Sequence, residues 1–166
     1  MNLEKYLVDV LGIKKLYLDP DFIRTQQQAS EQPEEILLKQ LDQLKNSTAK
    51  TLFIVLQNDL SATESTMLGK MAEALNWKDQ HDCLTFPEHL EEDTQSLLIE
   101  MITERLKKNS QHKMILFTED PALKKTSELD SFINIHHARI CDLPRSISVS
   151  QELKKITWDK IKMMKV

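Results

Sequence analysis

Short apolar runs and longer amphipathic stretches alternate along the last two thirds of the chain, from Thr51 onward. Thr51–Leu56 is a continuous apolar run, which is typical of a strand covered on both faces. The shorter runs Cys83–Phe86 and Met114–Phe117 predict two further strands, and Phe132–Cys141 is expected to contain another. Each of the first two strand-to-strand intervals has the length of a βαβ crossover, so the pattern favours parallel pairing.

Helical periodicity occupies the intervals between these strands. Ser61 followed three residues later by Glu64 is a capping box, which predicts a helix start. Residues 91–108 carry a second helix, and Ser148 with Gln151 is expected to open a C-terminal one. The apolar stripe behind Ser61, including its two methionines, is interpreted as core: Met67, Leu68, Met71, Ala72 and Leu75. This alternation predicts the α/β class, with three layers and a mostly parallel sheet flanked by helices.

An apolar segment, residues 1–22, precedes this body. It concentrates both tyrosines of the chain among leucines, and Gly12 is placed to end a short helix. Residues 23–50 then form a glutamine-rich polar linker and a helix that begins at Pro33, so residues 51–166 are expected to be the α/β domain. An apolar segment needs a surface to cover. That surface is either the chain's own domain or a groove on a partner protein.

Composition narrows the functional classes. With 166 residues, 40% apolar and 29% charged, the chain is sized for one ordinary globular domain. The net charge of −4 gives no global attraction for nucleic acid, and the lysines near Lys154 are interpreted as a solvated helix face. Two isolated glycines, Gly12 and Gly69, cannot form a phosphate-binding loop. No apolar run reaches membrane-spanning length and no signal peptide is visible, so we expect a cytoplasmic protein with free thiols.

Acidic residues follow two of the predicted strands and are the candidates for catalysis. Asp59 and Asp120 could share a cleft as acid and base or bind a metal, because ligands sit at the C-terminal ends of parallel strands. The simpler alternative is that both are ordinary turn or helix-capping residues, since a helix start follows each of them. Adjacent residues on a strand point to opposite faces, so His136-His137 is not expected to chelate an ion. The sequence therefore predicts no metal site, no cofactor and no catalytic motif.

Three short motifs, in order, resemble the psi subunits of bacterial DNA polymerase III. The opening Tyr6-x4-Leu11-Gly12-Ile13 followed by Tyr17 is similar to the family's aromatic, Leu-Gly-Ile, aromatic start. Phe53-Ile-Val-Leu-Gln-Asn58-Asp59-Leu60 looks like its strand ending in Asn-Asp-Leu, and the helix that follows also fits. The stretch Ala138-Arg-Ile-Cys-Asp-Leu143, and then Leu153 to Trp158-x2-Ile161, is similar to its final strand and its tryptophan-containing helix. The glutamine-rich linker and the helix from Pro33 depart from the family pattern.

The resemblance implies a uracil-DNA-glycosylase-like fold that lacks glycosylase activity, in a non-catalytic adaptor of the replicative clamp loader. The N-terminal segment would bind the clamp-loader ATPase subunits tau and gamma, and the α/β domain would bind the chi subunit. Contact with nucleic acid would be indirect. The implied partner-binding residues are Tyr6, Leu7, Leu11, Ile13, Leu16 and Tyr17, with Trp158 as a candidate for either the core or the chi interface. The alternative is an active or relic enzyme on nucleic acid that uses Asp59 as a general base.

Overall fold

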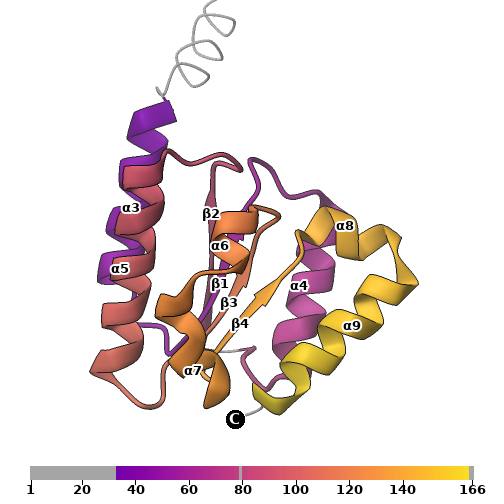
Figure 1. Cartoon of the computed structure of the whole chain (residues 1–166). Helices are drawn as coiled ribbons and strands as arrows, with labels where there is room; N and C mark the ends of the chain where they lie inside the picture. The colour runs from indigo at the N-terminus through magenta and orange to yellow at the C-terminus, as the bar shows by residue number, and fades with distance from the viewer. Residues whose placement is uncertain (1–32, 79, 165–166) are drawn as a thin grey trace, which may run out of the picture. The chain divides into compact units, whose positions relative to one another are not determined.

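The computed structural model describes residues 33–78 and 80–164 (Figure 1). The chain divides between Ile36 and Leu37, and the fold described below is that of the second unit. The predicted N-terminal partner-binding residues lie outside the described residues: Tyr6, Leu7, Leu11, Ile13, Leu16 and Tyr17. Their predicted role therefore stays a prediction.

A four-stranded sheet, all of it parallel, forms the centre of the unit. The strand order is β2-β1-β3-β4, and Thr51 pairs in register with His81 on one side and Lys113 on the other. The predicted α/β class with a parallel sheet is confirmed. The strands are β1 (Thr51–Leu56), β2 (His81–Phe86), β3 (Lys113–Phe117) and β4 (Ala138–Cys141).

Helices cover both faces of this sheet, as Figure 1 shows. On one face lie α3 (Pro33–Asn46) and α5 (Glu92–Lys108), and on the other lie α4 (Ala62–Ala74), α8 (Pro144–Val149) and α9 (Gln151–Ile161). Short segments complete the first face and the end of α9: α6 (Pro121–Lys124), η1 (Ser127–Leu129), α7 (Asp130–Asn134) and η2 (Lys162–Met164).

The apolar run of β1 divides its side chains between two core clusters. Because successive side chains of a strand point to opposite faces, Leu52 and Ile54 join the cluster under α3 and α5. Phe53 and Val55 join the cluster under α4, α8 and α9. Leu44 of α3 is 2% exposed in the first cluster, so this helix contributes to the core of the body.

The helix α4 begins where the sequence predicts, directly after Ser61. Ser61 Oγ accepts a hydrogen bond from the Glu64 backbone N–H at 3.2 Å, and the Glu64 carboxylate accepts one from the Ser61 N–H at 2.7 Å. The capping box is confirmed.

One expectation near the C-terminus is wrong in detail. Ser150, not Ser148, caps α9, because its Oγ accepts a hydrogen bond from the Leu153 N–H at 3.2 Å. Ser148 instead lies inside α8, a helix that Pro144 opens at a favoured first-turn position. The strand expected within Phe132–Cys141 is confirmed: it is β4, the last four residues of that stretch, and the first residues belong to α7.

None of the helices in the described ranges combines the length and the apolar character needed to cross a membrane.

Candidate partner-binding groove

An apolar groove of about 620 Å³ opens between α4 and α9. The short helix α8 contacts both of these helices, so it joins the two walls. The apolar side chains that line the groove come from both walls: Ala62, Met67, Met71, Ala74 and Trp158. An exposed apolar groove bounded by two helices is a typical place for a protein partner to dock.

Trp158 lies at this groove because of the way α9 packs. Thr157 and Ile161 are the buried residues of α9 and face the sheet. Trp158 follows Thr157 by one position, which turns its side chain by about 100° around the helix, away from the buried face. Its side chain is 37% exposed and lines the groove. Of the two alternatives left by the sequence, core or interface, this position favours the interface.

Two methionines of α4 form part of the same surface. The sequence predicts Met67 and Met71 to be core residues, and both do pack against the cluster around Phe53. Both remain partly exposed and line the groove. Methionine is unbranched and polarizable, so it adapts its shape to an incoming apolar side chain. Helical periodicity alone does not distinguish these partly exposed residues from the fully buried apolar residues of α4, Leu68 and Ala72.

The charged side chains that line the groove are both lysines. Lys70 stands on α4 and Lys154 on α9, so each wall carries one positive charge. Neither ammonium group makes an ion pair or hydrogen bond within the described part of the chain. The groove therefore combines an apolar lining with two uncompensated positive charges.

A second, polar cavity of about 430 Å³ lies at the C-terminal end of β1. Gln57, which is 5% exposed, donates from Nε2 to the Asp59 carbonyl at 2.6 Å and to Glu64 Oε2 at 2.9 Å. Its Oε1 accepts a hydrogen bond from the Arg145 backbone N–H at 3.4 Å. This network ties β1, α4 and α8 together at the edge of the sheet where the strand order reverses.

An ion pair bounds the same cavity. The Arg145 guanidinium donates two hydrogen bonds to the Glu88 carboxylate, one of them with Nη1 and Oε2 2.9 Å apart. This contact raises the pKa of Arg145. The Glu88 backbone N–H in turn donates to Asn58 Oδ1 at 3.3 Å. Several polar groups of this cavity therefore satisfy one another, which suits a structural role.

Asp59 and Asp120 do not share a cleft. Asp59 is exposed and lines the polar cavity, where Ser61 rather than Asp59 caps α4. Asp120 lines a different groove and is the N-cap of α6, since its Oδ1 accepts from the Ala122 N–H at 2.8 Å. The capping interpretation is confirmed for Asp120 and is wrong for the Asp59 side chain. The His136-His137 pair lies just before β4.

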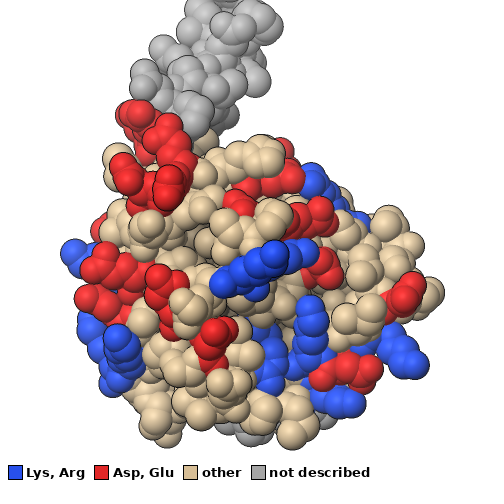
Figure 2. Space-filling view, in the orientation of Figure 1, with Lys and Arg blue, Asp and Glu red and all other residues tan. Residues whose placement is uncertain are grey.

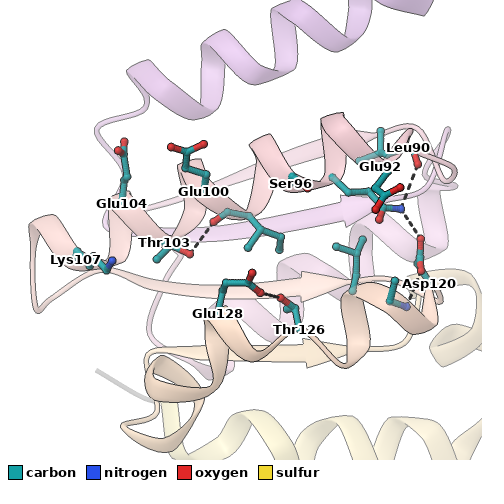
Figure 3. A pocket seen from close by; sticks show the side chains of 14 residues that line it. Leu90, Glu92, Ser96, Glu100, Thr103, Glu104, Lys107, Asp120, Thr126 and Glu128 are labelled. Carbon is teal, nitrogen blue, oxygen red and sulfur yellow. Dashed lines mark hydrogen bonds between the residues drawn. The ribbon is translucent and has the colours of Figure 1, made fainter.

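The groove that contains Asp120 is wide and acidic, about 780 Å³, between α5 and the α6–η1 segment. Figure 3 shows Glu100 and Glu104 on α5 and Glu128 on the opposite side. The Thr126 hydroxyl donates to Glu128 and lowers its pKa, and Gln95 Nε2 donates to Asp120 Oδ2 at 2.6 Å. Figure 2 shows the corresponding concentration of carboxylates over α5.

Comparisons with models of protein families, with curated proteins and with solved structures find no significant match.

Proposed function

We propose that this protein is a non-catalytic adaptor that binds partner proteins through its α/β body. The observation that carries the proposal is the apolar α4–α9 groove, in which Trp158 and two methionines stay accessible. Tryptophan is enriched at the energetic centres of protein interfaces, because a large ring buries much area at a small entropic cost. A partner that covers this groove would remove that apolar surface from water.

The motifs that resemble the psi subunits give the proposal its specific form. We propose a uracil-DNA-glycosylase-like fold and a place in the bacterial replicative clamp loader. Residues 1–22 would bind the ATPase subunits tau and gamma, and the groove that contains Trp158 would bind chi. The three-layer α/β architecture supports this proposal in so far as it provides the body that the resemblance implies.

Titration calorimetry of the full chain against purified bacterial chi and against the tau or gamma oligomer tests the proposal. We expect Trp158→Ala to weaken chi binding about tenfold or more, as expected for a residue at the centre of an interface. We expect Tyr17→Ala to weaken tau or gamma binding by at least about 1 kcal/mol while leaving chi binding intact.

Leu38→Ala is the matched control, since Leu38 is a 65% exposed apolar residue on α3, away from the groove. It should change neither affinity. If the chain binds none of chi, tau and gamma, the clamp-loader assignment is contradicted. Unchanged chi affinity in Trp158→Ala would contradict the assignment of the groove.

A nucleic-acid enzyme that uses Asp59 is the second candidate, favoured by the polar cavity beside Asp59 at the reversal of strand order. Its test is an assay of the full chain on single-stranded, duplex and uracil-containing DNA. If Asp59 is a general base, Asp59→Asn abolishes turnover, because the amide does not accept a proton. We expect no turnover by the unmodified chain. Turnover that disappears in Asp59→Asn would replace the adaptor proposal.

A further inference from the structure

We infer that the α4–α9 groove takes an amphipathic helix of a partner protein, with apolar anchors along one face and carboxylates at its flanks. This inference rests on the proposed function, in which the groove is a partner-binding surface. It adds the secondary structure and the charge of the segment that occupies it.

The charge of the occupant follows from the two lysines. Other cations of the body have carboxylate partners: Lys124 pairs with Asp142, and Lys162 with Asp159. Lys70 and Lys154 have none among the described residues, and no aspartate or glutamate lines the groove beside them. A bound segment would partly desolvate both ammonium groups, which is unfavourable unless it brings opposite charge. Carboxylates on both flanks of the occupant meet this requirement.

The helical form of the occupant follows from the walls. Both walls are helices, whose backbone groups are already paired along their own axes. The hydroxyl groups of Thr66 and Ser148 also donate within the body, to the carbonyls of Ala62 and Arg145. An extended strand in this groove would bury backbone N–H and C=O groups without partners, whereas a helix satisfies its own.

The length of the groove suits about three helical turns. The walls contain 13 residues in α4 and 11 in α9. At about 1.5 Å per residue these helices are roughly 16–20 Å long. Apolar residues at i, i+3, i+4 and i+7 of a partner helix would present one stripe to Met67, Met71 and Trp158.

A displayed library of helical peptides tests the inference on the full chain. The peptides carry fixed leucine anchors at i, i+3, i+4 and i+7, with randomised flanking positions. We expect selection on the unmodified chain to enrich aspartate and glutamate at the flanks. With Lys70→Glu/Lys154→Glu as the target, the same library should enrich lysine and arginine instead. A selected acidic peptide should bind this double variant at least tenfold more weakly.

Lys45→Glu/Lys108→Glu is the matched control, with the same change of charge near the end of α3 and at the last residue of α5. It should select the same acidic flanks as the unmodified chain. Selected peptides with no charge preference at their flanks would overturn the inference. So would a library that is enriched no more on the unmodified chain than on the Trp158→Ala variant. Self-association of the chain that depends on Trp158 would also overturn it, because the occupant would then be a second copy. Stronger peptide binding after deletion of residues 1–22 would do the same, because the occupant would then be the chain's own N-terminal segment. If chi binding still depends on Trp158 while the flanks show no preference, the proposed function stands and only this inference fails.

Discussion

Replacing Phe53 by alanine is expected to lower the free energy of unfolding by about 4 kcal/mol. Phe53 is 0% exposed in the central strand β1, so alanine leaves a cavity that the sheet cannot collapse around. The ring centroids of Trp77 and Phe117 lie 5.5 Å and 5.9 Å from that of Phe53, and both contacts are lost. Urea unfolding followed by far-ultraviolet circular dichroism measures the change.

Two further variants separate the contributions at this position. Phe53→Leu keeps most of the volume and should cost about 1–1.5 kcal/mol. Ile54→Ala removes an equally buried side chain on the other face of β1. It should destabilise the body by about 3 kcal/mol. Since the groove lies over the Phe53 face, Phe53→Ala should weaken the proposed binding of chi more than Ile54→Ala does, at temperatures where both variants are folded. A loss below about 1.5 kcal/mol for Phe53→Ala would contradict the packing described here.

Replacing Arg105 by methionine is expected to lower the free energy of unfolding by about 2–3 kcal/mol. From α5, Arg105 Nη1 donates to the carbonyls of Leu44 and Ser47 at 3.1 Å and 2.9 Å, and Nη2 donates to that of Ala49. These acceptors lie at the end of α3 and in the loop that leads to β1, where helix carbonyls lack partners within the helix. Burial lowers the pKa of Arg105, and the charge of Asp82 raises it. Methionine retains the aliphatic stem but donates no hydrogen bond.

Amide hydrogen exchange should show where this loss acts. We expect α3 to exchange faster in Arg105→Met, with the strands changed less. Arg145→Met is the matched control, because its ion pair with Glu88 lies at the surface, with the two side chains 47% and 24% exposed, and surface pairs contribute little. Equal destabilisation by the two variants would argue against the bridging role of Arg105.

Features that depend on neighbouring residues could be predicted from the sequence. The run Thr51–Leu56 predicts a buried strand because it is short, rich in β-branched and aromatic residues, and apolar at successive positions, as in a strand covered on both faces. Ser61 and Glu64 lie on one helical turn, so their reciprocal caps can be inferred from spacing. The sequence does not predict α8, because its six residues are too few for a periodic signal; Pro144 at its first turn is the one local cue to it.

The candidate groove could not be predicted, because its walls come from distant parts of the chain. Met67 and Trp158 line one groove only because the sheet places α4 and α9 on the same face. The periodicity of α4 does not reveal which part of its apolar side a neighbouring helix leaves uncovered. The hydrogen bond from Arg105 to the Ser47 carbonyl could not be predicted for the same reason, since it joins residues 58 positions apart. The family resemblance points to Trp158, but its position in the groove depends on how α9 packs.

The two tryptophans of the chain lie in contrasting environments, so their intrinsic fluorescence can report on the groove and on the core separately. Trp77 is 0% exposed, whereas Trp158 is 37% exposed. Emission from an indole in an apolar interior is blue-shifted and shielded from quenchers such as acrylamide, while an accessible indole is red-shifted and quenched. The red, quenchable part of the spectrum therefore reports occupancy of the groove, and the blue part reports, in the same sample, whether the interior is intact.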